Sequence, residues 1–412
     1  STLKGMEQKD LDKVLQNLSN IGMHWWQTPG DIRESIFNRY SSHLESKLAN
    51  SNSNSSSSSA LTLGTLVTLE KLGLSLLEED LPPSLASLLC KSIEQDCEER
   101  KVYGSCLSQM LRVLGSLSTR GSNSRFQRVE LPESTTKALL KKLTIVHPTL
   151  TQREGLEVLR GLGKMLPSRG SIDWGSKEGK AILAVGLTSV GNNSAGVLCQ
   201  SLSRLNWSVD FYKTENNIDK GEESLKLLAH ILRQPPLKNN GLATSKYFKA
   251  LPMYFIGLAK VIGRNYPIPL SIATGTGPVN GSDPDSPVTE LYHDVHVHVA
   301  ELVTELIEHL DQLNDQGVIN LLWALGQLGY AWEDSDSDSD LKDLKEDSHV
   351  YSVLPAEFKK AIHSKICASY AREEAFSYDT QSSSHSVMPH LSSSSENALA
   401  NSSMAGLQSF RE

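Results

Sequence analysis

The amino-acid sequence predicts an all-α protein, built as an α-solenoid of about seven to eight helix-turn-helix repeats. Three observations lead to this prediction: a recurring leucine triplet with helical spacing, a second helix-like segment between most triplets, and a composition poor in strand-forming residues. Of the 412 residues, 39% are hydrophobic and only 6% are aromatic. Leu and Ser dominate, whereas Val, Ile, Phe and Tyr are too sparse for a large sheet.

The triplet consists of three apolar residues spaced by three, with Leu at the centre of every clear copy. This spacing places the three side chains along one side of an α-helix, whereas a strand would need a spacing of two. Successive third residues lie 51, 45, 48, 40, 56 and 67 residues apart. The copies are Leu15-Leu18-Ile21, Leu66-Leu69-Leu72, Leu111-Leu114-Leu117, Leu159-Leu162-Met165, Cys199-Leu202-Leu205, Phe255-Leu258-Val261 and Leu322-Leu325-Leu328, with a weak eighth at Met404-Leu407-Phe410.

The position after the central Leu is mostly small. Glycine there costs helix propensity, about 1 kcal/mol relative to Ala. Its recurrence therefore predicts that a neighbouring helix packs very close at this point. The residues are Ser19, Glu70, Gly115, Gly163, Ser203, Ala259 and Gly326.

A second helix is expected in nearly every interval, and several of these segments begin with Pro near the first turn, as at Pro83, Pro132 and Pro355. The repeat unit is thus a helix A with the triplet, a turn, and a helix B. One pair cannot bury its apolar face alone, and stacked neighbours supply the core. The expected B segments are 31–48, 83–95, 133–143, 177–190, 222–233, 288–310 and 355–371.

Inserted segments lengthen some intervals, and without them the period is about 40 residues. We expect a helical array over residues 1–376, with disordered insertions near 50–60, 274–287 and 333–348. A Ser-rich tail follows over 377–412, and the weak eighth triplet would make it a degenerate terminal repeat. The chain begins at Ser1 rather than Met, so we expect a processed form or a fragment, in which a removed targeting peptide would not be visible.

The net charge of −8 is concentrated between residues 333 and 347, which hold eight acids and two lysines. The rest of the chain is near neutral, so attraction of the whole molecule to nucleic acid is not implied. Five cysteines without a CxxC pair form neither a disulfide framework nor a zinc pattern, and they suit a reducing compartment. No stretch of 18 apolar residues exists, so no membrane span is expected.

A second pattern on helix A concerns the positions one after the first triplet residue and one before the third. They are four apart and share a face. Among the fourteen there are six basic residues and no acids, where composition predicts about 1.4 basic and about 1.6 acidic residues. We call these positions the helix A stripe: Gln16/Asn20, Val67/Lys71, Arg112/Ser116, Arg160/Lys164, Gln200/Arg204, Ile256/Lys260 and Trp323/Gln327.

Two interpretations of the stripe stay open. In the first, Lys and Arg neutralise phosphates, Gln, Asn and Arg read base edges, and Trp323 stacks on a base. The candidate RNA-binding residues are then Gln16, Asn20, Lys71, Arg112, Arg160, Lys164, Gln200, Arg204, Lys260, Trp323 and Gln327. In the second, the stripe is a solvated helix face, with or without contact to helix B of the next unit. Broader positive charge, which usually accompanies single-strand binding, is missing.

Other motifs indicate no catalytic, metal or cofactor site. His293, His296 and His298 cannot converge from one helix, because His298 lies on another side. Ser134-Thr135-Thr136-Lys137 matches SxxK, but it follows Pro132 at a helix start, where Ser and Thr are common. Gly275-Thr276-Gly277 is not followed by the Lys of a phosphate loop. Cys90 and Cys97, seven apart, are expected in the core.

The segment Leu321-Leu322-Trp323-Ala324-Leu325-Gly326-Gln327-Leu328-Gly329-Tyr330 resembles the helix A signature of octotricopeptide repeats, which is close to LLWALAKLGY. Heptatricopeptide repeats and the helical part of FAST-kinase-domain proteins share this style of motif. Residues 156–166, 198–207 and 254–263 are weaker echoes. Many members of these families end in a RAP domain; none is recognisable here, and a nuclease-like activity is not expected.

The resemblance implies an organellar protein, mitochondrial or alternatively plastid, that binds single-stranded or ribosomal RNA. Such proteins act with protein partners in transcript processing, stability or translation. The alternative is a scaffold subunit of a mitochondrial ribosome or another large organellar assembly, which the near-neutral body and long insertions favour. Enzyme activity is not expected, because no nucleophile, base and stabilising group can be assembled from the sequence.

Overall fold

The structure, a computed structural model, describes residues 6–22, 25–49, 58–77, 79–98, 102–120, 127–166, 172–191, 194–208, 218–233, 245–262, 287–331 and 352–382. These residues form fourteen α-helices, so the all-α prediction is confirmed for the described part. Contacts divide the chain into two compact units, residues 1–361 and 362–412. The division falls within the last helix, α16 (Ala356–Ser382).

The helices alternate between two series. Each helix of the A series carries one of the seven triplets, and each helix of the B series overlaps one of the seven segments expected between them. The A helices are α1 (Gln8–Asn20), α3 (Ser58–Lys71), α5 (Gly104–Leu117), α7 (Gln152–Met165), α9 (Ala195–Arg204), α12 (Ser245–Ile262) and α15 (Asp315–Gln327). The B helices are α2 (Gly30–Ala49), α4 (Pro83–Glu98), α6 (Glu133–Val146), α8 (Lys177–Ser189), α11 (Ile218–Arg233), α14 (Pro287–Ile307) and α16.

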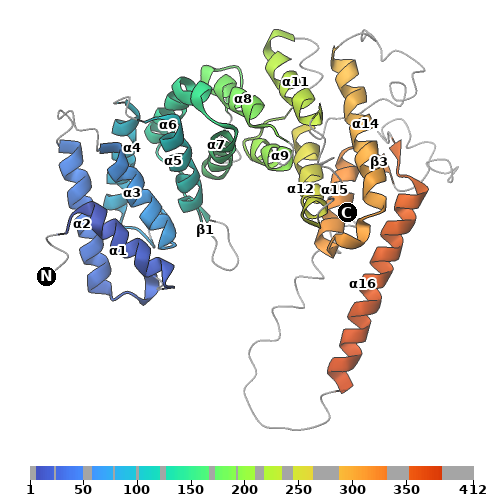
Figure 1. Ribbon diagram of the computed structural model, residues 1–412, viewed down its shortest axis with the longest axis horizontal. Helices are drawn as coiled ribbons and strands as arrows, with labels where there is room; N and C mark the ends of the chain where they lie inside the picture. Colours follow the sequence, from blue (N-terminus) through green and yellow to red (C-terminus); the bar gives the residue numbers. More distant parts are fainter. Residues whose placement is uncertain are drawn as a thin grey trace, which may run out of the picture. The chain divides into compact units, whose positions relative to one another are not determined.

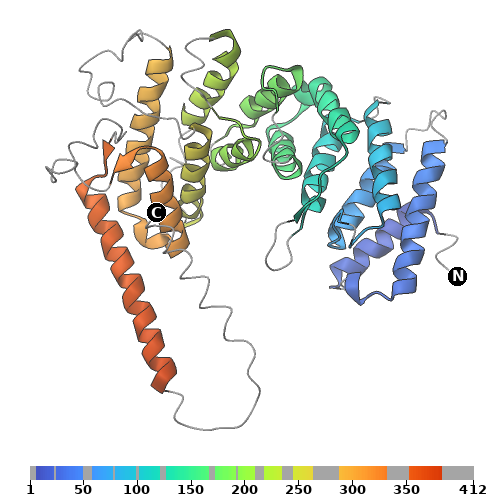
Figure 2. The ribbon, with the colours of Figure 1, turned by 180° about the vertical axis from the view of Figure 1, so that it is seen from behind.

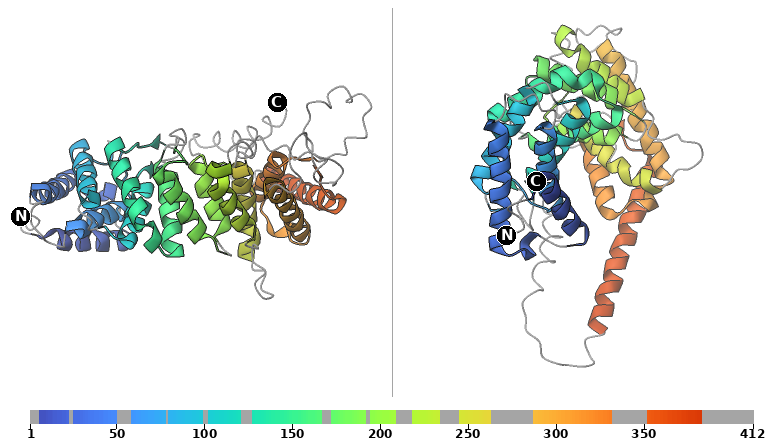
Figure 3. Two further views of the ribbon diagram at one scale, coloured as in Figure 1. Left: turned by 90° about the horizontal axis from the view of Figure 1, so that it is seen from above. Right: turned by 60° about the vertical axis from the view of Figure 1, so that its left-hand side comes forward.

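Within residues 1–361 each helix packs on the next helix of its own series. The A contacts run from α1 to α3, α5, α7, α9, α12 and α15, and the B contacts run from α2 to α4, α6, α8, α11 and α14. Figures 1 and 2 show these helices following one another in sequence order, and Figure 3 shows successive pairs side by side. Helices of one pair also touch, as α3 touches α4 and α7 touches α8.

The triplets form much of the core. Most of their side chains are buried, including all three in α5, α7, α9 and α12. Leu18, Leu72 and Leu322 are half-buried. Ile21 is the exception at 79% exposed, because it lies at the C-terminal end of α1, the first A helix of the described chain.

The residue that follows the triplet repeats a backbone conformation. Gly22, Gly73, Asn206 and Gly329 have φ values of 84°, 73°, 56° and 86°, in the left-handed region that favours glycine and tolerates Asn. After α3 and α9 the next N–H groups, from Leu74 and Trp207, donate to carbonyls five residues back, Leu69 and Leu202, at 3.0 Å. This is the Schellman geometry of a helix end. Four of the seven A helices are therefore followed by a left-handed residue, and two of these four show the Schellman hydrogen bond.

Glycines allow close helix contacts, but only partly where the sequence indicates. A Cβ on Gly115 would lie 2.8 Å from the backbone of Gly161, and one on Gly163 would lie 3.0 Å from the carbonyl oxygen of Ser201. The close approach expected at those two positions is confirmed. At Gly326 the expectation is wrong: this residue is exposed, and nothing lies within 4 Å of its Cβ position. Gly161 was not expected, although its Cβ would lie 2.3 Å from Leu111 O.

Polar side chains begin several helices. Thr151 and Glu154 form a reciprocal capping box on α7, and Ser176 and Asn314 cap α8 and α15. Such caps satisfy N–H groups that have no partner within the helix. They also fix where each helix begins after its connecting turn.

The edges of two expected insertions and of the expected tail need correction. Residues 58–60, Pro287 and residues 377–382 are helical, because α3 begins at Ser58, α14 begins at Pro287 and α16 continues to Ser382. Ser and Pro suit the first turn of a helix, so the boundary composition was misread. The remainder of the 50–60 and 274–287 insertions, the whole 333–348 insertion, the rest of the 377–412 tail and the eighth triplet lie outside the described residues.

Strands are minor in the described chain. Residues 119–120 (β1) pair antiparallel with 127–128 (β2), and residues 330–331 (β3) pair parallel with 352–353 (β4). Across the described helices, none combines the length and apolar character needed to cross a membrane.

Candidate nucleic-acid interface

Every position of the helix A stripe remains accessible after folding. None of the fourteen side chains is buried: Asn20, Lys71, Arg160, Arg204, Lys260 and Trp323 are exposed, and the other eight are half-buried. The A helices pack on one another in order, so the stripe positions follow one another from α1 to α15. The stripe is therefore a surface of the A series, distinct from the buried triplets beside it.

At the N-terminal end the stripe residues form hydrogen bonds and an ion pair with side chains of neighbouring A helices. Gln16 donates from Nε2 to Thr68 Oγ1 at 2.9 Å and accepts at Oε1 from Lys71 Nζ at 3.0 Å. Arg112 of α5 forms a bidentate ion pair with Glu70 of α3, with both N–O distances at 2.9 Å. These contacts join neighbouring A helices and not a B helix of the next unit. They also compensate the charge of Arg112.

In the middle of the stripe the charges are less compensated. Arg160 and Lys164 of α7 make no ion pair or hydrogen bond with another side chain of the described chain, and Arg160 is exposed. Arg204 follows on α9, the next A helix. A ligand would thus meet two basic side chains on α7 that no acidic side chain of the described chain neutralises.

At the C-terminal end Lys260 and Trp323 lie together. Lys260 Nζ is 6.0 Å from the centroid of the Trp323 ring, at the outer limit of a cation–π contact. Trp323 is 41% exposed, which leaves part of its ring accessible. An ammonium group beside an accessible indole combines a phosphate contact with a stacking surface.

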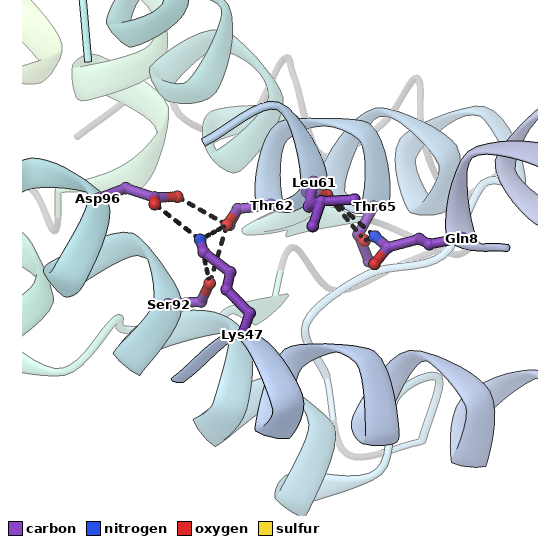
Figure 4. A network of polar contacts seen from close by, with 7 residues as sticks. All are labelled: Gln8, Lys47, Leu61, Thr62, Thr65, Ser92 and Asp96. Atoms are coloured by element: carbon purple, nitrogen blue, oxygen red, sulfur yellow. Dashed lines mark hydrogen bonds and ion pairs between the residues drawn. The ribbon is translucent and has the colours of Figure 1, made fainter. Parts of the chain in front are cut away.

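A buried polar cluster was not expected from the sequence, and Figure 4 shows it between α2, α3 and α4. Lys47 Nζ lies 2.7 Å from Asp96 Oδ1 and donates to Ser92 at 2.7 Å, while Thr62 donates to Asp96 Oδ2 at 2.7 Å. The side chains of Lys47 and Asp96 are 4% and 0% exposed. In the same view Gln8 donates to Thr65 and to the Leu61 carbonyl. No local pattern marks this cluster, because its residues lie up to 49 positions apart.

The other motifs have structural partners. The hydroxyls of Ser134 and Thr135 donate to Glu94 Oε1 at 2.7 and 2.5 Å, which ties the start of α6 to α4. His298 is buried and lies 2.8 Å from the Tyr254 hydroxyl, and burial lowers the pKa of its imidazole. The side chains of His293 and His296 and residues 275–277 lie outside the described part. In the part that is described, no three metal-ligating side chains gather.

The expected burial of two cysteines is confirmed: Cys90 and Cys97 are 8% and 7% exposed. Burial raises the pKa of Cys97 to about 12 and that of Cys199 to about 12, with nearby Asp96 adding to the shift at Cys97. A thiol with such a pKa stays protonated and is a poor nucleophile near neutral pH. Both side chains therefore act as small apolar residues of the core.

Likeness to known proteins does not add to this picture. The described geometry contains a packed double series of helices, an accessible stripe and a buried polar cluster. The resemblance to octotricopeptide repeats still rests on the residues around Trp323. Comparison with protein-family models, with curated proteins and with solved structures finds no match to this chain.

Proposed function

We propose that this protein is an α-solenoid of seven helix pairs that binds single-stranded RNA along the helix A stripe. The observation that carries the proposal is the accessibility of all fourteen stripe positions, on helices that pack one after another. Six of these positions are basic and none is acidic. Lys and Arg in such a row can follow the phosphates of an extended strand.

The middle of the stripe is the strongest part of this surface. Arg112 is compensated by Glu70, whereas the side chains of Arg160 and Lys164 project without a described partner. We therefore place the main phosphate contacts on α7, α9 and α12, at Arg160, Lys164, Arg204 and Lys260, and the stacking contact at Trp323. A location in a mitochondrion or plastid, and a role in transcript processing, stability or translation, complete the proposal and rest on the resemblance.

The test is binding of the full chain to a single-stranded RNA at several salt concentrations. Replacement of Arg160, Lys164, Arg204 and Lys260 by Ala should weaken binding and flatten its salt dependence, because fewer counterions are released. A matched control replaces Lys91, Lys141, Lys177 and Lys360, four exposed lysines on B helices, and loses the same charge. Equal weakening in both variants, or none in the first, would overturn the proposal.

A second candidate function is a scaffold in a large organellar assembly. The observation that favours it is apolar exposure in the turn between α1 and α2, where Ile21 and Trp26 are 79% and 69% exposed. Exposed apolar surface of this kind often marks protein contacts. The scaffold function is supported if the native protein sediments with a large particle after nuclease treatment, and if replacement of Ile21 and Trp26 by Ser abolishes this co-sedimentation. Sedimentation as a free protein counts against it.

A further inference from the structure

A cavity of about 740 Å³ lies at the N-terminal end of α5, away from the triplets. Its wall includes Tyr103, Gly104 and Ser105 at the start of α5, Lys142 and Ile145 near the end of α6, and Thr149. This size falls within the range of about 300–1,000 Å³ that is usual for small-molecule sites. It exceeds what a single inorganic ion would fill.

Lys142 is the unusual residue of this wall. It is only 4% exposed, and it makes no hydrogen bond or ion pair with any other residue that the structure describes. An ammonium group with so little access to water is stabilised by an anionic partner. Asp96 lies close enough to act on the same thiols as Lys142, but its two oxygens are already held by Lys47 and Thr62. Lys47, Asp96 and Lys142 thus carry two positive charges and one negative charge, and the negative charge is paired with Lys47.

The start of α5 supplies further donors to the same space. Tyr103 is the N-cap residue, and no side chain caps this helix. The N–H groups of Gly104, Ser105 and Cys106 have no acceptor within the helix, and the helix dipole adds positive potential there. By contrast, the start of α7 is closed, because the Glu154 carboxylate accepts hydrogen bonds from Thr151 N and Oγ1 at 2.9 and 2.8 Å. Glu154 therefore lines the cavity with one carboxylate oxygen, Oε2, already hydrogen-bonded at the start of α7.

We propose that this cavity binds a phosphate monoester, with the phosphate held by Lys142 Nζ and the first N–H groups of α5. A tetrahedral dianion matches several converging N–H donors and one ammonium group, as at other helix N-termini that bind phosphate. The organic part of the ligand lies against Tyr103 and Ile145, whose side chains are 74% and 64% exposed at the mouth. The ester is either a free nucleoside monophosphate or the phosphorylated end of an RNA strand.

A neighbouring hollow connects this site to the helix A stripe. It has a volume of about 640 Å³, shares Ser105, Thr151 and Glu154 with the first cavity, and reaches Arg112. An RNA strand on the stripe could therefore place its terminal phosphate against Lys142. The mononucleotide form of the proposal is independent of the proposed RNA-binding function, because it uses no stripe residue.

Calorimetric titration of the full chain with AMP, adenosine and inorganic phosphate tests the site. AMP should bind with a Kd below about 1 mM, and adenosine should not. Lys142→Met keeps most of the side-chain volume and should weaken AMP binding by more than about tenfold, since a charged hydrogen bond is lost. Lys141→Met is the matched control, because Lys141 is the adjacent residue, is exposed, and should leave AMP binding unchanged.

Tyr103→Ala provides a second variant that does not endanger folding, because this side chain is mostly exposed. This substitution should weaken the binding of AMP more than the binding of inorganic phosphate. Absence of AMP binding to the wild-type chain would falsify the phosphate site. So would AMP binding with wild-type affinity by folded Lys142→Met and Tyr103→Ala variants.

Two RNAs of one sequence, with a 5′-phosphate and with a 5′-hydroxyl, separate the two sources. A preference for the phosphorylated strand that depends on Lys142 assigns the site to RNA ends. Equal binding of both strands, together with AMP binding, assigns it to free nucleotides. Replacing the four stripe residues Arg160, Lys164, Arg204 and Lys260 should leave AMP binding intact, so failure of the stripe and failure of this site are distinguishable.

Discussion

Two regions of this protein join their helices by different means. Between α1 and α4 the contacts include buried polar groups: Lys47 with Asp96, and the Tyr40 hydroxyl, which donates to Asp12 Oδ1 at 2.6 Å. Between α5 and α9 the closest contacts join backbones, with Gly161 against Leu111 and Gly115, and the one buried hydroxyl between α5 and α7 that the described residues show is Ser108, which donates to Glu154 O at 3.1 Å. Both regions nevertheless place their A helices in one continuous series.

The difference shows how two energetic solutions produce the same arrangement of helices. A buried ion pair gains little net stability over an apolar pair, but each partner needs the other once both are buried. A glycine contact needs no partner chemistry, only the absence of a side chain where two backbones meet. We therefore expect the first region to be sensitive to loss of one charge and the second to be sensitive to added volume.

The largest expected effect is in the first region. Asp96→Ala leaves Lys47 buried without its carboxylate and should lower the free energy of unfolding by about 3–5 kcal/mol. Urea denaturation followed by circular dichroism measures this change. The double variant Lys47→Met, Asp96→Leu should recover most of the loss, because apolar residues replace both charges. A loss under about 1 kcal/mol for Asp96→Ala would contradict a tightly coupled pair.

A smaller effect is expected in the second region. Gly161→Ala places a methyl group 2.3 Å from Leu111 O, so the two helices must move apart. We expect a loss of about 1–3 kcal/mol, net of the gain in helix propensity. Gly326→Ala is the control, because its Cβ meets nothing within 4 Å, and it should gain up to about 1 kcal/mol. The comparison fails if both variants shift the thermal midpoint in the same direction.

The ion pair at the junction between the two regions should contribute less to the free energy of unfolding than either of the interactions above. The Arg112–Glu70 pair joins α5 to α3, and its side chains are 37% and 20% exposed. Partly exposed pairs are screened by solvent, so a double-mutant cycle with Arg112→Ala and Glu70→Ala should give a coupling of up to about 1 kcal/mol. Added salt should reduce it. A coupling that salt does not change would place the pair among the buried interactions instead.

The smallest expected effect is a pH dependence at Asp12 in the first region. Burial raises the pKa of this carboxyl above 3.8, against the lowering effect of hydrogen bonds from Tyr40 and Thr68. The folded chain therefore holds the proton more tightly than the unfolded chain. This contribution to stability is present below pH 3.8 and is lost as the pH rises through the folded pKa.

Asp12→Asn removes this titration while keeping an oxygen that can accept from Tyr40. Its free energy of unfolding relative to wild type should grow as the pH rises above about 4 and then level off. Urea midpoints of both proteins across this range measure the difference. A difference that shrinks with rising pH would reverse the assigned sign.

Much of the fold could be predicted because helix signals are local. The triplet spacing located all seven A helices, and the Pro and polar residues near the starts of the B helices located those starts within four residues, although α16 continues eleven residues past the expected end at 371. The small residues predicted the close contact at Gly115 correctly, but the same prediction was wrong at Gly326. A glycine allows a neighbouring helix to approach closely, but it does not require one to be there. The recurring left-handed residue after the triplet, as at Gly73 and Gly329, was visible in the sequence as a Gly and was missed.

The candidate sites were less predictable. Accessibility of the stripe follows from helical periodicity, since a face adjoining a buried triplet must turn outward. The compensation of Arg112 by Glu70 does not follow from it, because the two residues are 42 positions apart. Nor could the cavity beside Lys142 be foreseen: a Lys in an amphipathic helix is usually solvated, and here packing of α6 buries it.

Local sequence patterns are sufficient to predict an all-helical chain, the order of its two helix series and the apolar side of each A helix, because these depend on residues three or four apart. Which polar groups meet depends on tertiary packing. Lys47 finds Asp96, Arg112 finds Glu70, and Lys142 finds no partner among the described residues. These outcomes depend on how helices more than 40 residues apart pack against each other. Because burial removes water from the charged groups, the presence or absence of a partner then changes the stability of the fold.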